Sequence, residues 1–257
     1  ITNPVIRQIF EENKNILWIT TDYGINRFNI ATKKFQPYYL GYKDKETFRE
    51  HSFLATRNSE GLILAASYKS GIYKFNTKSE DFEPFPIPEI DKNNIIQLFF
   101  DSSDNLWIVN DKNEIFRLKI KSDKITEKQK ITPPADFLHL CYDKKEKIWF
   151  QYENYTLGYY SIQTEKFSDW GSKPYGELNE VLENEGNILF ATNTGLIQYN
   201  KHTKTESILL SGIPVLSVYS GTQDILWVGT DSQGIYRILP PQNYFNTFTS
   251  NNIPELG

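Results

Sequence analysis

Short apolar runs separated by polar turns recur along this chain. In residues 15–28, Leu17, Trp18 and Ile19 form one apolar run, a polar turn closes at Gly24, and a second run follows at 25–28. Turn residues between two short runs of β-branched and aromatic side chains predict a β-hairpin, because glycine readily adopts positive φ and branched side chains suit a pleated surface. The pattern therefore indicates a chain built from hairpins.

The same hairpin pattern occurs six times. The steps between equivalent apolar positions are 46, 43, 42, 40 and 38 residues, close to the roughly 40–45 residues of a four-stranded propeller blade. Another apolar run precedes each hairpin, and we expect these runs to be the innermost strands. The equivalent positions are Trp18, Leu64, Trp107, Trp149, Leu189 and Trp227, and the preceding runs are 5–10, 52–56, 95–100, 137–142, 178–182 and 215–219.

A polar turn after each third strand leads to a short fourth strand, headed by residues such as Phe35, Phe82 and Phe167. Four strands per repeat predict an all-β fold, a β-propeller of four-stranded antiparallel blades. Six repeats are visible, so the chain is expected to be six-bladed or part of a seven-bladed ring. We expect 1–257 to be a single propeller domain or a fragment of one, with blades at about 5–40, 51–86, 95–127, 136–170, 177–210 and 215–249.

The residues that follow Arg237 bear on the number of blades. They number roughly twenty, too few for another four-stranded blade. We interpret 245–248 as the last outer strand of the sixth repeat and 251–254 as a linker. This favours a truncated piece of a larger protein, as does the absence of any Met among the 257 residues.

Composition narrows the possible partners. Hydrophobic residues make up 39% of the chain and aromatic residues 15%, which suits many short strands rather than long buried helices. The formal net charge of −4 and the lack of any Lys/Arg run argue against phosphate-backbone binding, so no nucleic-acid partner is expected. No apolar stretch approaches the roughly 18–20 residues of a membrane helix, and no membrane segment is expected in this piece.

The titratable residues do not have the spacing typical of a catalytic or metal-binding site. Cys141 lies in an apolar run and is expected to be buried and unreactive. The three histidines, His51, His139 and His202, lack the spacing of metal ligands, and no Gly-x-Ser-x-Gly pattern occurs. We therefore expect no catalytic residue, no metal and no cofactor. Enzymatic activity remains an alternative, because acidic residues far apart in the sequence could meet around a central channel and act as general acid and general base. These residues are Asp22, Asp111, Glu153 and Asp231.

Strand parity predicts where a ligand would bind. In an up-and-down blade, the connections from strand 2 to 3 and from strand 4 to the next strand 1 lie on one face. These connections are more variable than those on the other face, and binding residues concentrate on variable loops, so this face is the candidate ligand-binding face. Several of these loops carry aromatic side chains beside charged or amide groups, which suit carbohydrate binding. The alternative is that the tyrosines only cap the blade edges. The candidate ligand-binding residues on this face are Arg49, His51, Tyr68, Lys69, Tyr152 and Tyr155.

The repeat, Asn-x-Leu-Trp-Ile-x-Thr-x-x-Gly-Ile/Leu-x-Arg-Phe/Tyr, resembles the two-component regulator propeller repeat. Residues 227–237 match best and 18–28 next, whereas the repeats around Leu64, Trp149 and Leu189 lack the Trp or the Gly-Thr pair. The resemblance implies a periplasmic sensor region of a bacterial hybrid two-component system, a sensor histidine kinase/response regulator. Such regions usually hold two seven-bladed propellers and a β-sandwich ahead of a membrane helix and kinase, and commonly sense polysaccharide fragments. The family has no shared ligand-contact motif, so the resemblance identifies no binding residue.

Together these observations predict a ligand-sensing propeller without catalytic activity of its own. The expected partners are an oligosaccharide and a neighbouring propeller domain of the same chain or a homodimer partner, and binding would act by changing how rigid discs pack. The expected location is periplasmic, as part of an inner-membrane protein whose kinase region lies outside this chain. The alternatives are a propeller enzyme of the lyase or lactonase type, or a protein-interaction scaffold without a small ligand.

Overall fold

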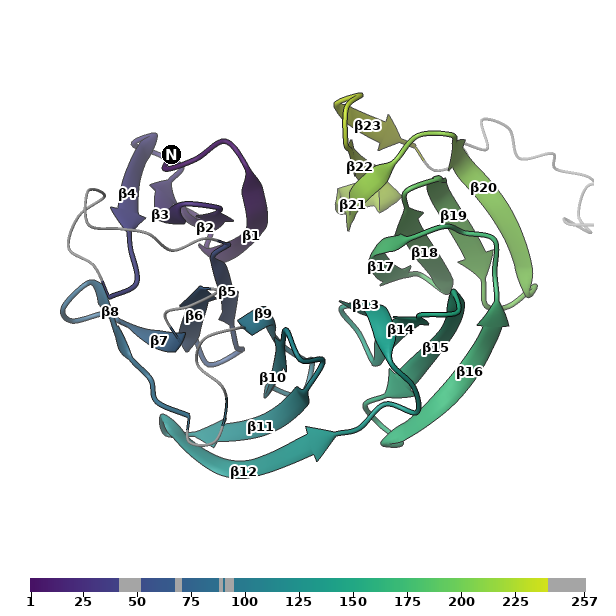
Figure 1. The fold of residues 1–257 in the computed structure, drawn as a ribbon. Helices are drawn as coiled ribbons and strands as arrows, with labels where there is room; N and C mark the ends of the chain where they lie inside the picture. Colours follow the sequence, from purple (N-terminus) through teal and green to yellow (C-terminus); the bar gives the residue numbers. More distant parts are fainter. Residues whose placement is uncertain (42–51, 68–70, 88–89, 91–94, 240–257) are drawn as a thin grey trace, which may run out of the picture. The chain divides into compact units, whose positions relative to one another are not determined.

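The computed structural model describes residues 1–41, 52–67, 71–87, 90 and 95–239. In these ranges the chain consists of β-strands and their turns, apart from one short 3-10 helix, η1 (Thr222–Asp224) (Figure 1). Consecutive strands pair antiparallel and form six separate sheets in sequence order. This confirms the all-β class and the six repeats.

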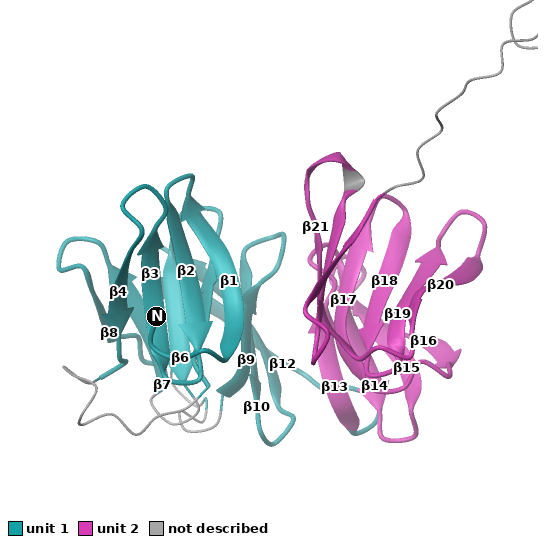
Figure 2. Cartoon of the chain, turned by 90° about the horizontal axis from the view of Figure 1, so that it is seen from above, with its two compact units in different colours: residues 1–136 teal, residues 137–257 magenta. Residues whose placement is uncertain are grey.

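Three four-stranded sheets make up a compact unit of residues 1–136, here unit 1 (Figure 2). In each sheet the strands lie in sequence order from the first to the fourth. Blade 1 is β1 (Ile6–Asn13), β2 (Ile16–Thr21), β3 (Gly24–Asn29) and β4 (Lys34–Tyr38); blade 2 is β5 (Leu54–Arg57), β6 (Ile63–Ser67), β7 (Gly71–Asn76) and β8 (Asp81–Pro84); blade 3 is β9 (Ile95–Phe100), β10 (Asn105–Asn110), β11 (Ile115–Lys121) and β12 (Lys124–Ile131).

The second compact unit, residues 137–257 and here unit 2, holds the other three sheets (Figure 2). The sixth sheet has three strands within the described part of the chain, and the fourth strand expected at 245–248 lies outside it. Blade 4 is β13 (Phe137–Tyr142), β14 (Lys147–Tyr152), β15 (Thr156–Ser161) and β16 (Lys166–Ser172); blade 5 is β17 (Leu178–Asn184), β18 (Asn187–Thr192), β19 (Gly195–Asn200) and β20 (Thr205–Ser211); blade 6 is β21 (Val215–Ser220), β22 (Leu226–Thr230) and β23 (Ile235–Ile238).

Within each unit, successive blades pack face to face through their inner strands. In unit 1, β5 contacts both β1 and β9; in unit 2, β17 contacts both β13 and β21. Side chains alternate between the two faces of each strand, so every middle blade contributes to two cores. Blade 2, for example, sends Ile63 and Ala65 toward blade 1 and Leu64 and Ala66 toward blade 3. This stacking of four-stranded antiparallel sheets is the architecture of a β-propeller.

The repeated tryptophan occupies a defined place in the blades. Trp18, Trp107 and Trp149 are at most 1% exposed. Each indole N–H donates to a carboxylate six residues earlier in the chain, with Nε1 to oxygen distances of 2.8 Å to Glu12, 2.8 Å to Asp101 and 3.4 Å to Asp143. A buried donor without an acceptor is destabilising, so the acid makes burial of the indole possible.

Blade 6 lacks this arrangement. Trp227 is 44% exposed, and the residue six positions earlier is Gly221, which has no side chain to accept the indole N–H. Tyr219 and Ile235, on the same face, are 65% and 74% exposed. The face of blade 6 that carries Trp227 is therefore an exposed apolar surface within the described part of unit 2.

The turns between third and fourth strands share one backbone conformation. The residue directly before the fourth strand has φ between 51° and 61° in each of the five described turns, although it is not glycine. Such left-handed residues reverse the chain sharply and fit the polar turns predicted there. These residues are Lys33, Glu80, Asp123, Glu165 and Lys204.

Candidate functional site

The candidate ligand-binding face collects the connections from strand 2 to 3 and from strand 4 to the next strand 1. Four of the six residues expected to bind ligand lie outside the described residues: Arg49, His51, Tyr68 and Lys69. Of the other two, Tyr152 is the last residue of β14 and Tyr155 lies in the connection between β14 and β15 of unit 2. Their role in binding stays a prediction.

The β14–β15 connection is a tight turn. The Tyr155 backbone N–H donates to the Tyr152 carbonyl at 2.8 Å, and Tyr155 has a φ of 62°. The Asn154 side-chain oxygen accepts from both the backbone N–H and the hydroxyl of Thr156, at 3.0 and 2.6 Å. The turn is thus held by its own polar groups, and Tyr155 stands at its end with 49% of its surface exposed.

Tyr152 has a different environment from Tyr155. It is 9% exposed, and its ring is stacked with Phe150 at a centroid distance of 6.1 Å. Its ring also covers Gly158: a Cβ added at that glycine would lie 2.9 Å from the Tyr152 ring and hydroxyl. Burial, and secondarily the negative charge of Asp169, raises the pKa of the Tyr152 hydroxyl above its ordinary value. Tyr152 therefore packs the blade, and Tyr155 is the tyrosine that this turn presents to solvent.

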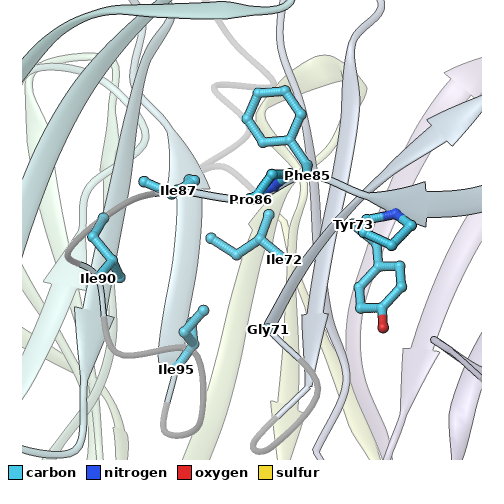
Figure 3. Close-up of a pocket in the computed structure, with 9 residues that line it drawn as sticks. Gly71, Ile72, Tyr73, Phe85, Pro86, Ile87, Ile90 and Ile95 are labelled. Atoms are coloured by element: carbon cyan, nitrogen blue, oxygen red, sulfur yellow. The ribbon is translucent and has the colours of Figure 1, made fainter.

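Unit 1 has a cavity of about 220 Å³ on its own part of the candidate face. It lies where β7 begins, beside residues 84–87 and Ile90 (Figure 3). Four isoleucines gather around it, and all four are at most 7% exposed. The lining residues are Gly71, Ile72, Tyr73, Pro84, Phe85, Pro86, Ile87, Ile90 and Ile95.

Backbone contacts fix one wall of this cavity. The Phe85 N–H donates to the Ile72 carbonyl at 2.8 Å, which extends the pairing of β7 with the chain beyond β8. The Ile90 N–H donates to the Ile87 carbonyl at 3.4 Å. Pro86 restricts the backbone between these two contacts, because its ring fixes φ. The wall is consequently stiff on the side that carries Phe85.

Tyr73 lies on the opposite side of β7 from Ile72. Its hydroxyl points away from the four isoleucines (Figure 3). A Cβ added at Gly41 would lie 2.7 Å from that hydroxyl, so the tyrosine approaches the Gly41 backbone closely. Gly41 also has a φ of 75°, which glycine adopts without strain. This pair joins the end of blade 1 to blade 2.

The cavity was not expected from the sequence. Its apolar walls come from residues that pattern analysis assigns to the core or to a connection, not to binding. One local feature could have drawn attention to it: the run 84–87, Pro-Phe-Pro-Ile, follows a fourth strand and is richer in apolar residues than the connections after β16 and β20. Two prolines beside two large apolar side chains indicate a stiff apolar wall.

Of the acidic residues weighed for catalysis, Asp22 and Asp111 belong to unit 1, and Glu153 and Asp231 belong to unit 2. Asp22 is paired with Arg7 at 2.6 Å in unit 1, whereas Glu153 belongs to the β14–β15 turn of unit 2. Cys141 is buried, as expected, and burial raises the pKa of its thiol to about 12, so the thiol stays protonated at neutral pH. Across the described ranges, no three His, Cys, Asp or Glu side chains are grouped so that they could hold a metal ion. Nor does any helix in those ranges have the length and apolar character to span a membrane.

Comparisons with known proteins give structural neighbours but no sequence family. No family model matches the chain, and no curated protein matches it. Among solved structures, the extracellular domain assigned to the hybrid two-component system BT3049 from B. thetaiotaomicron has a TM-score of 0.69 and 19% identity, covering 95% of this chain and 36% of that one. The extracellular domain assigned to BT4673, from the same organism, has a TM-score of 0.67 and 18% identity, covering 91% of this chain and 33% of that one.

A propeller enzyme is also similar. Catalytically inactive virginiamycin B lyase from Staphylococcus aureus, with quinupristin, has a TM-score of 0.65 and 15% identity, covering 91% of this chain and 84% of that one. The chain spans about a third of the length of the two-component neighbours. Extracellular domains of two-component systems are thus among its structural neighbours, as the repeat resemblance predicted, and the likeness at these identities establishes that the fold of this chain is a β-propeller.

Proposed function

We propose that this chain is an extracytoplasmic ligand-sensing propeller of a two-component signalling protein, and that it recognises an oligosaccharide. The observation that carries the proposal is the likeness over 95% of the chain to an extracellular domain assigned to a hybrid two-component system. The repeat pattern around Trp18 and Trp227, which resembles the same class of sensor regions, is consistent with it. The proposed location is the periplasm, as part of an inner-membrane histidine kinase.

Two surfaces on the candidate face support saccharide recognition. Tyr155 offers an exposed aromatic ring at the end of a turn that its own hydrogen bonds hold in place. Aromatic faces pack against the C–H surfaces of sugars, and the neighbouring Asn154 and Thr156 carry groups that can bond hydroxyls. The cavity of unit 1 adds a concave apolar site of about 220 Å³.

Signalling in this proposal proceeds through packing. The blades have close-packed cores, such as the one formed by Trp18, Phe75 and Phe82. Close-packed cores deform little, whereas interfaces between domains or protomers can switch between discrete arrangements. Ligand binding is therefore proposed to act on the contact with a neighbouring propeller domain or a homodimer partner.

The test is calorimetric titration of the chain with a panel of charged and neutral oligosaccharides. Saturable binding is expected, and Tyr155→Ala should weaken it about fivefold to tenfold, the effect of one aromatic contact. Tyr219→Ala is the matched control, because it removes another exposed tyrosine from a strand of blade 6 and should leave affinity unchanged. Absence of binding to every member of the panel would contradict direct saccharide sensing.

Specific observations favour two other functions. The likeness to virginiamycin B lyase, of which 84% is covered, is compatible with a propeller enzyme; turnover of any titrated ligand, seen as a new product by mass spectrometry, would favour that function. The exposed face of Trp227, Tyr219 and Ile235 is compatible with a protein-interaction scaffold, since large exposed apolar patches mark interaction surfaces.

A further inference from the structure

We propose that the outer edge of β20 in blade 5 is a self-association surface, on which β20 of a second copy of the chain pairs antiparallel about a two-fold axis. The inference rests on the proposed signalling through packing and names the surface that a homodimer uses. It concerns Thr205–Ser211, all of which lie in the described part of unit 2. These residues belong to a different blade from the Tyr155 turn and from Trp227.

β20 is the last strand of its sheet (Figure 1). Its inner edge pairs with β19, and no other strand in the described part of the chain pairs with its outer edge. A strand in this position presents backbone N–H and C=O groups that can pair with another chain, and proteins usually protect such edges with lysine, proline or other charged side chains. The composition of a fourth strand therefore indicates whether its edge is protected.

The fourth strands of blades 1–4 carry such protection. β4 contains Lys34 and Pro37, and β8 is four residues long with two acids and a proline. β12 contains four charged residues, and β16 contains Lys166 and Asp169. β20, in contrast, reads Thr-Glu-Ser-Ile-Leu-Leu-Ser and has no lysine, arginine or proline. Among the five described fourth strands, β20 is therefore the least protected against pairing.

The side chains of β20 favour pairing with another strand. Ile208 is 67% exposed although it lies within the strand. The single charged residue, Glu206, pairs with Lys173 in the connection between β16 and β17. A β-bulge occurs in β12 and β16 as well as in β20, so the bulge does not account for the difference between these edges. A partner strand at the edge of β20 would cover Ile208 and meet little net charge.

The low charge of β20 determines which strand fits it. A strand rich in lysine or in acids would place charged side chains beside Ile208 without a counter-charge. A second copy of β20 avoids this. In a two-fold pair centred on Ile208, this residue lies opposite Ile208 of the second copy, and Glu206 lies opposite Leu210. No like charges are opposed, whereas like charges directly opposite each other destabilise a strand pair. The two-fold axis also covers the edge of both copies at once.

The size of the contact predicts a weak dimer. β20 has seven residues, fewer than the roughly 20–30 residues on each side of a stable protein interface. We therefore expect an equilibrium in which single and paired copies are both populated. A ligand that binds one of the two states better shifts such an equilibrium, as the proposed signalling through packing requires.

Sedimentation equilibrium of the chain at increasing concentration tests the proposal without any saccharide. Wild type is expected to change from monomer to dimer. Ile208→Lys should weaken self-association about tenfold or more, because it opposes like charges at the centre of the pair. Ile235→Lys is the matched control and should leave association unchanged, since it makes the same substitution at a strand isoleucine of blade 6 that is 74% exposed.

Two results of this experiment would overturn the proposal. One is a chain that stays monomeric at every concentration. The other is a dimer that Ile208→Lys weakens no more than Ile235→Lys does, because the contact would then lie elsewhere on the molecule.

A cross-link gives a second measurement, which does not depend on loss of binding. Ile208→Cys should form a disulfide-linked dimer under mild oxidation, because residue 208 lies opposite its own copy, and opposite residues have Cβ atoms about 4.5–5.5 Å apart. Ile235→Cys is the control, and wild type should stay unlinked because Cys141 is buried. Circular dichroism shows whether each variant is folded, and the cross-link decides the matter if Ile208→Lys does not fold. Cross-linking of Ile208→Cys no faster than that of Ile235→Cys would refute the pairing.

The outcomes separate this inference from the proposed function. If oligosaccharides bind and respond to Tyr155→Ala while the chain stays monomeric, saccharide sensing stands and the β20 surface fails. If the chain dimerises through β20 while no oligosaccharide of the panel binds, the β20 surface stands and saccharide sensing fails.

Discussion

At the scale of single residues, the acidic residue six positions before the repeated large apolar residue makes different contacts in different blades. Six residues before the repeated large apolar side chain, Glu12, Asp101 and Asp143 accept an indole N–H. In blade 5 the large residue is Leu189, which has no polar group, and the acid at this position is Glu183. Glu183 binds lysines instead, so the carboxylate keeps a partner although the tryptophan is absent.

Glu183 makes a pH-dependent contribution to stability. Its side chain is 2% exposed and pairs with Lys201 at 2.5 Å and Lys145 at 3.1 Å, with Lys147 at 3.7 Å. Burial acts to raise the pKa of Glu183, but these lysines outweigh burial, and the net pKa is lowered. A carboxyl whose pKa is lowered by folding stabilises the protein above its unfolded pKa and loses this contribution as the pH falls through its folded pKa.

We therefore expect Glu183→Gln to lower the free energy of unfolding by about 1–2 kcal/mol at pH 7. The difference from wild type should shrink once the pH falls below about 4, near the pKa of an unfolded Glu. Urea unfolding at several pH values measures it. Glu146→Gln is the control, because Glu146 is 43% exposed in its pair with Lys147 and should change stability by less than about 0.5 kcal/mol. A pH-independent difference would contradict the assignment.

The contact between Gly158 and Tyr152 gives a second prediction. Gly158→Ala places a methyl group 2.9 Å from the Tyr152 ring and 3.1 Å from the Ser168 carbonyl oxygen. We expect a loss of about 1–3 kcal/mol from overpacking, measured by thermal or urea unfolding. In a Tyr152→Ala background the cost of Gly158→Ala should fall, because the ring is gone. Strict additivity of the two substitutions would show that the ring does not pack on the glycine.

At the scale of strands and blades, the alternation of apolar and polar residues located most elements. The innermost strands β9 and β13 begin and end where the apolar runs 95–100 and 137–142 do. β5 begins later than the predicted run 52–56. The reason is tertiary: the backbone N–H groups of Ser52 and Phe53 donate to the Asp22 and Thr21 carbonyls of blade 1, and only Leu54 onward pairs with β6.

Another boundary differs for a local reason. The turn expected at 184–187 is tighter in the structure, because β17 continues to Asn184 and pairs with Asn187. The two residues between them, Glu185 and Gly186, have φ of 46° and 78°. Positive φ at both central residues is the geometry of a two-residue hairpin turn, which lengthens the flanking strands. The residue types allowed this turn but did not require it.

The packing of one blade on the next predicts unequal roles for equivalent tryptophans. Trp18 is fully buried, with its ring 4.9 Å from that of Phe75 and 5.6 Å from that of Phe82 in blade 2. Trp18→Leu should cost about 2–4 kcal/mol, although blades 2 and 5 carry Leu at this position, because blade 2 is shaped for the larger ring. Trp227→Leu is the matched control at the same repeat position and should cost less than about 1 kcal/mol.

Chemical unfolding of both variants, followed by circular dichroism, measures this difference. Equal losses would mean that burial of the ring between blades does not set its contribution. A smaller loss for Trp18→Leu than for Trp227→Leu would reverse the argument altogether.

At the scale of the whole molecule, each of the two compact units has apolar cores of its own. The clusters between blades 1, 2 and 3 belong to residues 1–136, and those between blades 4, 5 and 6 to residues 137–239. A sheet of three or more strands needs a packed apolar face to be stable on its own, and each unit contains three such sheets. We expect fragments 1–136 and 137–257, produced separately, each to show β-sheet circular dichroism and a cooperative thermal transition. Lack of a transition in both fragments would contradict this.

The sequence was sufficient for the fold but not for the site. Repeat spacing and alternation predict six antiparallel sheets because each repeat carries its pattern locally, at the same offsets from Trp18 and its equivalents. The candidate site depends on contacts between repeats, and these contacts cannot be predicted from the sequence pattern within one repeat. Tyr152 and Tyr155 look alike in sequence, yet only the packing of Tyr152 over Gly158 distinguishes them. The single propeller domain and the roles of Arg49, His51, Tyr68 and Lys69 stay predictions.

The uneven burial of the tryptophans gives the chain an internal optical probe. Trp18, Trp107 and Trp149 are at most 1% exposed and Trp170 is partly buried, whereas Trp227 is 44% exposed. Emission from the buried indoles comes from an apolar surrounding, and iodide in solution cannot reach them. The long-wavelength, iodide-quenchable part of the fluorescence therefore belongs mainly to Trp227, so anything that covers its face of blade 6 is detectable by light alone, without a label.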